Sequence, residues 1–353
     1  MRTFEPLQLH ESYMQRCFQL ARLGAGKVAP NPMVGAVLVY EDKIIGEGYH
    51  EAYGGPHAEV NCVASVAKEN WHLIAKSTLY VSLEPCSHFG KTPPCTDLII
   101  KERIPKVVIA GTDAHKMVNG QGVQRLRNHG IEVITGILEQ EAIALNAAFF
   151  TFHQKQRPYI ILKWAQSNDG FIGKLTERVH ISNVLTNRMV HQWRSEVMGI
   201  MVGTNTVRVD NPHLTARIDQ AKNPIRITVD QQLSLPVTSN IFDGTVPTYV
   251  YNEIKASIEN NVHYRLINME QHLMGDIFAD LFQLGIQSVL VEGGASLLQS
   301  CIDQDYWDVA RVISNTSLHM ENGVKAPLFN ISKQINQQFI QNDCITYYQN
   351  PKA

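Results

Sequence analysis

The sequence lacks long apolar runs, a strong charge of either sign and a dense set of cysteines. No run of about eighteen apolar residues occurs, so no membrane span is expected, and no charged start followed by an apolar stretch indicates a signal peptide. The formal net charge is −2 over 353 residues, which excludes an overall attraction to nucleic acid or anionic membranes. Six scattered cysteines fit a reducing compartment better than a disulfide framework. We therefore expect a cytoplasmic protein that binds neither membrane nor nucleic acid.

The chain is longer than a usual single domain, and 44% of its residues are apolar, so two domains with separate cores are expected. The polar segment 154–158 marks the boundary region. We place a first domain at residues 1–152 and a second at 153–353. Strand-like and helix-like segments alternate in both, which predicts α/β folds.

Hydrophobic periodicity predicts the elements of both halves. In the first half we expect strands at 36–40 and 44–50, joined as a hairpin, and at 78–83, 107–111 and 131–134. Helices are expected there at 12–23, 60–69, 96–102, 121–129 and 139–146. In the second half we expect strands at 158–165, 199–203, 225–230, 248–251, 264–268, 288–291 and 309–313, helices at 187–197, 274–284 and 297–301, and more sheet after 334.

Two short segments carry the clearest chemistry, His57-Ala58-Glu59 and the stretch from Cys86 to Cys95. One imidazole and two thiolates can bind Zn²⁺ and leave a fourth tetrahedral position for water, whose pKa the ion lowers toward neutrality. Glu59 can move protons without binding the metal. This pattern is the zinc deaminase signature, although eight residues separate the cysteines here instead of two. We expect one Zn²⁺ per chain on His57, Cys86 and Cys95, with Glu59 catalytic.

Two other interpretations of these residues stay open at this point. His88 could complete a structural zinc site with four protein ligands. Alternatively, a buried histidine and two unrelated cysteines could share no metal at all. A structural role is also the ordinary interpretation for Cys17 and Cys62, which read as small buried side chains.

The first half resembles the deaminase half of the bifunctional riboflavin-biosynthesis deaminase/reductase family. The motifs are Asn31-Pro-x-Val-Gly35, Gly46-x-Gly-x-His50, His57-Ala-Glu59 and Glu84-Pro-Cys-Ser-His-x-Gly-Lys-Thr-Pro-Pro-Cys95. The resemblance implies a cytidine-deaminase-like three-layer α/β/α fold. It also implies that the substrate is 2,5-diamino-6-ribosylamino-4(3H)-pyrimidinone 5′-phosphate and that Asn31, His50 and Lys91 bind it.

The second half resembles the reductase half of the same family, in the order of the fused protein. The motifs are Lys163-x-x-x-Ser167-x-Asp169-Gly170, Val202-Gly203-x-x-Thr206, Asp210-Asn-Pro-x-Leu214-Thr-x-Arg217 and Val291-Glu-Gly-Gly-x-x-Leu297. The resemblance implies a dihydrofolate-reductase-like α/β fold and NADPH as cofactor. A Gly-rich turn between a buried strand and a helix also offers backbone N–H groups to a phosphate.

The resemblance assigns residues of the second half to two ligands. NADPH would lie against Ala165, His180, Thr206, Asp210, Gly294, Ala295, Ser296, Leu297, Leu298, Gln299 and Ser300. The substrate would lie against Lys163, Arg178, Arg194, Leu214, Arg217 and Glu292. Arg194 and Arg217 are candidates to clamp its phosphate, and Lys163 and Asp210 to polarise or protonate the sugar.

The chain departs from the family at three positions of its second half. Arg178 and His180 align with a substrate-facing serine and a cofactor-facing tryptophan, and Asn168 replaces a common leucine. One alternative is therefore a deaminase whose second domain is impaired in reduction. An RNA-binding module is a further alternative, against which the neutral charge argues. The family resemblance also implies a homo-oligomer.

Overall fold

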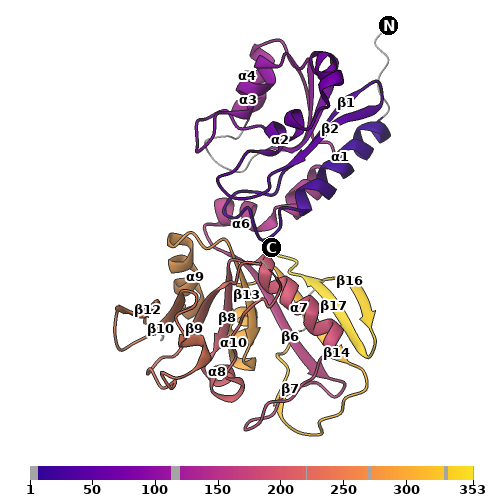
Figure 1. Cartoon of the computed structure of the whole chain (residues 1–353). Helices are drawn as coiled ribbons and strands as arrows, with labels where there is room; N and C mark the ends of the chain where they lie inside the picture. Colours follow the sequence, from indigo (N-terminus) through magenta and orange to yellow (C-terminus); the bar gives the residue numbers. More distant parts are fainter. Residues whose placement is uncertain (1–6, 113–119, 220, 269–271, 330–332, 353) are drawn as a thin grey trace. The chain divides into compact units, whose positions relative to one another are not determined.

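The computed structural model describes residues 7–112, 120–219, 221–268, 272–329 and 333–352. The chain divides into two compact units, Met1–Lys155 and Gln156–Ala353 (Figure 1). The division follows Lys155 instead of residue 152 because the last helix of unit 1, α6 (Ala147–Lys155), continues to that residue. No helix within the described ranges is long and apolar enough to cross a membrane.

Unit 1 is built on a five-stranded sheet of order β2-β1-β3-β4-β5. β1 pairs antiparallel with β2 and β3, whereas β3, β4 and β5 run parallel. Alternate β1 residues enter different cores: Ala36 and Leu38 join one, Val37 and Val39 the other. Both faces of the sheet are therefore covered, which confirms the three-layer α/β/α prediction. The strands are β1 (Gly35–Tyr40), β2 (Lys43–Tyr49), β3 (Thr78–Leu83), β4 (Lys106–Gly111) and β5 (Glu132–Thr135).

Most helices of unit 1 contribute to these two cores, whereas Phe149 and Phe150 of α6 pack with Leu83 in a smaller cluster. Cores on opposite faces contain residues of α1 and α5 on one side and of α2, α3 and α4 on the other. The helices are α1 (Leu7–Arg22), α2 (Ala58–Ala64), α3 (Cys95–Lys101), α4 (Gln121–Asn128), α5 (Glu139–Leu145) and α6, with a 3₁₀ segment η1 (Lys68–Lys76).

Helix α2, which follows His57, packs unusually close to β2. A Cβ on Gly48 would lie 2.3 Å from the Cys62 backbone nitrogen, so only glycine fits there. The predicted extension of this helix to Glu69 was wrong. The Ser65 hydroxyl donates to the Cys62 carbonyl and accepts from the Glu47 N–H, which ties the end of α2 to β2.

Unit 2 contains a ten-stranded sheet of order β11-β12-β10-β9-β8-β13-β6-β14-β17-β16. Its central strands, from β12 to β14, are parallel, and β11, β17 and β16 add antiparallel edges. The strands are β6 (Tyr159–Ser167), β8 (Gly199–Gly203), β9 (Ile225–Val229), β10 (Thr248–Asn252), β11 (Ser257–Glu259), β12 (Val262–Leu266), β13 (Ser288–Gly293), β14 (Val309–Asn315), β16 (Lys333–Ile340) and β17 (Asp343–Gln349).

Helices cover both faces of this sheet. One large core contains residues of α9 and α10, and a second contains residues of α7. The helices are α7 (Val184–Glu196), α8 (Thr204–Asp210), α9 (Leu273–Gln283) and α10 (Ala295–Asp303), with a 3₁₀ turn η2 (Asn240–Phe242). A small ladder joins β7 (Phe171–Gly173) to β15 (Val324–Lys325). The α/β prediction for this half is confirmed.

Candidate functional site

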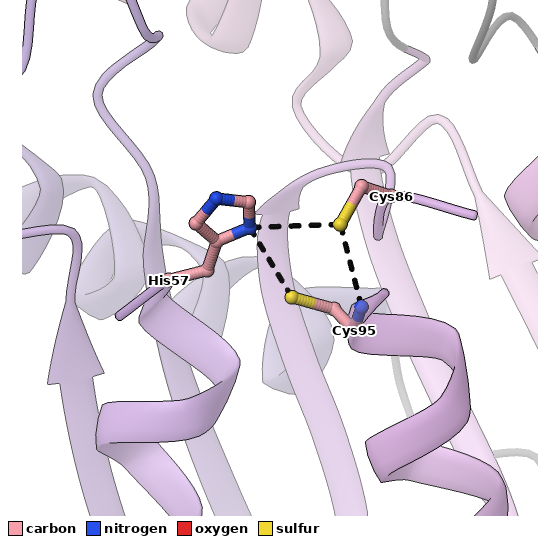
Figure 2. A group of neighbouring side chains, drawn as sticks. All are labelled: His57, Cys86 and Cys95. Carbon is pink, nitrogen blue, oxygen red and sulfur yellow. Dashed lines mark hydrogen bonds between the residues drawn. The ribbon is translucent and has the colours of Figure 1, made fainter. Parts of the chain in front are cut away.

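Three potential metal ligands of unit 1 converge at the starts of two helices. His57 is the N-cap residue of α2, Cys95 opens α3, and Cys86 lies in the turn after β3. Their ligand atoms all lie within 4.8 Å of one another. Nδ1 of His57 lies 3.5 Å from Sγ of Cys86 and 3.4 Å from Sγ of Cys95. Figure 2 shows this ring nitrogen turned toward both sulfurs.

These separations fit a zinc ion. Zn–N and Zn–S bonds at a tetrahedral angle place the nitrogen and each sulfur about 3.6 Å apart, close to the distances seen here. Within the described ranges, His57, Cys86 and Cys95 are the only group of three or more such ligands gathered this closely. His88 is not part of that group, so the geometry favours three protein ligands and an open position over a closed structural site.

The surroundings of Cys86 favour the thiolate form of its side chain. A hydrogen bond from Cys95 and a second from His57 lower the pKa of Cys86 to about 4, against the opposing effect of burial. The Cys95 backbone N–H also donates to the Cys86 sulfur at 3.3 Å. The same thiol contact raises the pKa of Cys95. Thiolate is the form that binds metal, so the site is prepared for a cation.

Glu59 lies in the first turn of α2 and is 3% exposed. Its carboxylate is not part of the group formed by His57, Cys86 and Cys95. Burial raises the pKa of Glu59, and the Cys86 thiolate adds to the effect. A carboxylate with a raised pKa is suited to accept and return a proton near neutral pH.

Asn31 and His50 form one hydrogen-bonded pair beside the ligand group. The Asn31 amide lies 3.1 Å from Nε2 of His50, whose Nδ1 lies 2.9 Å from the Pro56 carbonyl. Burial lowers the pKa of His50, so the ring is neutral, donating at Nδ1 and accepting at Nε2. The His50 ring meets the His57 ring edge-on, with centroids 5.3 Å apart. Lys91 is exposed in the segment between the two cysteines.

Unit 2 carries a cavity of about 1370 Å³ at the ends of its central strands. Every residue that we assigned to the cofactor or the substrate of this half lines it, with one exception. Gln299 lies on another side of α10, where it bonds to the Leu328 N–H and to Asp303. The residues that do line it are Lys163, Ala165, Arg178, His180, Arg194, Thr206, Asp210, Leu214, Arg217, Glu292, Gly294, Ala295, Ser296, Leu297, Leu298 and Ser300.

A buried charge cluster forms part of the cavity wall. Glu292 accepts two hydrogen bonds from Arg194 and lies 3.7 Å from the Lys163 ammonium. Burial alone would raise the pKa of Glu292, but the two cations lower it to about 2. Burial lowers the pKa of Lys163. The Arg194 guanidinium therefore donates hydrogen bonds to Glu292 and to the Thr215 carbonyl. The sequence had instead predicted that Arg194 and Arg217 clamp the substrate phosphate.

Asp210 is the second carboxylate of this cavity. Burial raises its pKa, while the neighbouring Arg178, His180 and Lys163 oppose that effect electrostatically. Arg178 and His180, at which the chain departs from the family, therefore both influence the pKa of the Asp210 carboxyl. Both are exposed at the cavity lining.

His191 also lines the cavity and was not among the site residues expected from the sequence. Its Nδ1 lies 3.2 Å from the Thr215 carbonyl, and burial lowers its pKa. The signal was present, because His191 precedes Arg194 by three positions on the predicted helix, and such residues share a helical face.

Comparisons with known proteins agree with this geometry. A sequence profile of the cytidine and deoxycytidylate deaminase zinc-binding region matches residues 7–111, and one of the RibD C-terminal domain matches residues 158–317. The riboflavin biosynthesis protein RibD of Aquifex aeolicus is 40% identical over 85% of each chain. That of Escherichia coli is 34% identical over 81% of this chain and 82% of its own.

Solved structures extend the similarity to the whole chain. A diaminohydroxyphosphoribosylaminopyrimidine deaminase/5-amino-6-(5-phosphoribosylamino)uracil reductase of Thermotoga maritima superposes with a TM-score of 0.88 at 35% identity, covering 98% of this chain and all of that one. RibD of Acinetobacter baumannii gives a TM-score of 0.86 at 29% identity, covering 97% and 99%. With both halves matched in order, the chain belongs to the RibD family of bifunctional deaminase/reductase enzymes in riboflavin biosynthesis.

Proposed function

We propose that unit 1 deaminates 2,5-diamino-6-ribosylamino-4(3H)-pyrimidinone 5′-phosphate with Zn²⁺, and that unit 2 reduces the product with NADPH. The observation that carries the first step is the convergence of one imidazole nitrogen and two sulfurs at zinc-like separations beside the buried Glu59. The observation that carries the second is the cavity with its buried cluster of Lys163, Arg194 and Glu292.

In the deamination, His57, Cys86 and Cys95 hold the ion. When bound, Zn²⁺ supplies a nucleophile at neutral pH by lowering the pKa of water. Glu59 would accept a proton from the attacking water and give it to the ring nitrogen. It would then take the remaining hydroxyl proton of the adduct and give it to the amino group, which leaves as ammonia while the ring carbonyl forms. Asn31 and His50 orient the pyrimidine, and the Lys91 ammonium binds the phosphate.

In the reduction, the turn between β13 and α10 receives NADPH, because its backbone N–H groups at the start of a helix attract phosphate. When bound, NADPH supplies the hydrogen and two electrons that C1′ of the ribosyl group gains, and a proton completes the ribityl product. Lys163 and Asp210, which both line the cavity, are the candidates to deliver that proton. The lowered pKa of Lys163 brings its ammonium closer to the range in which proton transfer is efficient.

One experiment tests both steps on the whole protein. Zinc-loaded protein receives the diaminopyrimidine phosphate and NADPH, and ammonia release is followed together with the near-ultraviolet absorbance of NADPH. Both signals should change, with ammonia first. If the deaminated intermediate with NADPH gives no loss of absorbance, unit 2 does not reduce it, and the deaminase-only alternative holds. We also expect a homo-oligomer, which light scattering would measure.

A further inference from the structure

Two loops of unit 1 end at the candidate metal ligands, and a side chain of one lies over an aromatic ring of the other. Residues 51–56 lead into His57, and residues 87–94 connect Cys86 to Cys95. The Lys91 ammonium lies 4.0 Å from the centroid of the Tyr53 ring. This separation is well inside the range in which a cation is attracted to an aromatic face.

The loop that carries Tyr53 is held in place by its backbone. The Tyr53 N–H donates to the Lys27 carbonyl at 3.1 Å, and the Gly55 N–H donates to the Ala52 carbonyl at 3.0 Å. Gly54 has a φ of +83°, and a Cβ there would lie 3.6 Å from Cδ of Lys91 and 3.8 Å from its Nζ. The lysine stem therefore lies along this loop, with its ammonium over the ring.

This contact restricts a side chain that is otherwise among the most mobile. An exposed lysine has four rotatable bonds, and binding an anion orders them at an entropic cost. A lysine already held on an aromatic face has lost part of that freedom before the ligand arrives, which favours binding. An ammonium has three N–H donors, and a ring face occupies one side of it, so donors remain for an anion.

We propose that Tyr53 is a positioning residue, which holds the Lys91 ammonium so that it receives the phosphate of the pyrimidine substrate. The inference rests on the proposed deamination and adds the residue that determines affinity for the phosphorylated form. Tyr53 itself has no role in the proton transfers of Glu59, so it acts on binding and not on the chemical step.

Steady-state kinetics of ammonia release test this with three variants of the full-length, zinc-loaded protein. Tyr53→Leu removes the ring and should raise KM about two- to fivefold with kcat unchanged, the range of an exposed cation–π contact. Tyr53→Phe keeps the ring and should resemble the wild type. In a Lys91→Met background, Tyr53→Leu should raise KM no further. Since Tyr53 is 47% exposed, its replacement does not threaten the fold.

Unit 2 provides a matched control. Lys255 lies over the Tyr264 ring at the same 4.0 Å, outside the lining of the cavity. Tyr264→Leu removes an equivalent contact and should leave the KM for deamination unchanged. The proposal is overturned if Tyr53→Leu leaves KM unchanged, if it lowers kcat alone, if Tyr53→Phe is as impaired as Tyr53→Leu, or if the effect persists without Lys91.

A measurement without turnover separates this proposal from the proposed function. In protein labelled with ¹³C-lysine, the ε protons of Lys91, assigned by their loss in Lys91→Met, should be shifted upfield by the ring. That shift should disappear in Tyr53→Leu, and inorganic phosphate should move the signal at lower concentration in wild type than in this variant. An unshifted wild-type signal overturns the proposal. Absent ammonia release with a shifted, phosphate-sensitive signal overturns the deaminase assignment instead.

Discussion

Arg194 of α7 and Glu292 of β13 form a two-point ion pair in the cavity wall, with Nε to Oε1 at 2.6 Å and Nη2 to Oε2 at 2.7 Å. The two side chains are 14% and 6% exposed. The ammonium of Lys163, on β6, lies 3.7 Å from Oε2 of the same carboxylate. One carboxylate therefore balances two buried cations from different elements, and it holds them at the surface that the ligands of unit 2 would contact.

Glu292→Gln should destabilise unit 2 by about 3–5 kcal/mol, because removing one partner leaves buried charges uncompensated. Urea unfolding followed by tryptophan fluorescence measures this, since Trp164, Trp193 and Trp307 all lie in unit 2. The control is Glu177→Gln, whose partner Lys174 is exposed and which should change stability by less than about 0.5 kcal/mol. Equal effects of the two variants would contradict the role of the pair.

The Glu292 carboxylate also makes the stability of unit 2 depend on pH. The folded pKa of Glu292 is lowered to about 2 from an ordinary 4.5. A lowered folded pKa means that the ionised group stabilises the fold fully above its unfolded pKa, and that this contribution is lost as pH falls toward the folded value. The difference in unfolding free energy between wild type and Glu292→Gln should therefore be constant above about pH 5 and narrow steadily toward pH 2. A difference that stays constant through this window would exclude the linkage.

Local patterns in the sequence were sufficient to predict much of the fold. The β1–β2 hairpin is an example, because an apolar run is interrupted by Glu41-Asp42 and resumes directly. Both turn residues have positive φ, 45° and 61°, as tight two-residue hairpin loops require. The sequence also indicated which three side chains converge as candidate metal ligands, since the ligand types and their order along the chain are themselves the motif.

Side-chain contacts between elements that are distant in the sequence could not be predicted from it. Nothing in the sequence near Arg194 indicates that Glu292, 98 positions away, takes its guanidinium, so a free phosphate clamp was expected instead. The α8 helix was missed because it spans only Thr204–Asp210, too short for periodicity to distinguish it from a loop. The contact between Tyr53 and Lys91 likewise depends on how two loops fold together.

Cys95→Ser should remove zinc and ammonia release while NADPH oxidation with the deaminated intermediate continues, because only residues of unit 2 line the described cavity. Metal analysis and the two activity assays measure the three quantities. Cys62→Ala is the matched control, since Cys62 is a fully buried residue of α2 in the apolar core and lies outside the ligand group. It should keep its zinc. Full zinc content in Cys95→Ser would show that this sulfur is not a ligand.

Glu59→Gln should keep its zinc and its fold but lose ammonia release by a factor of about 10²–10⁴, the usual contribution of a general acid–base group. An amide of the same size cannot carry the proton, and Glu59 lies outside the ligand group. Glu47→Gln serves as control: this β2 residue pairs with a half-exposed arginine, Arg16, and should release ammonia at the wild-type rate. A Glu59→Gln variant that turns over normally would remove the carboxylate from the mechanism.

Arg178→Gln should move the pH dependence of NADPH oxidation to higher pH. The Arg178 charge lowers the pKa of Asp210, partly offsetting burial, so its removal raises that pKa further. Whichever limb of the pH–rate profile reports Asp210 should shift upward, and Asp210→Asn should abolish that limb. Lys174→Gln is the control, because Lys174 lines the same cavity but is not among the charges that act on Asp210. An unchanged profile in Arg178→Gln, or an equal shift in Lys174→Gln, would mean that this departure from the family does not act through Asp210.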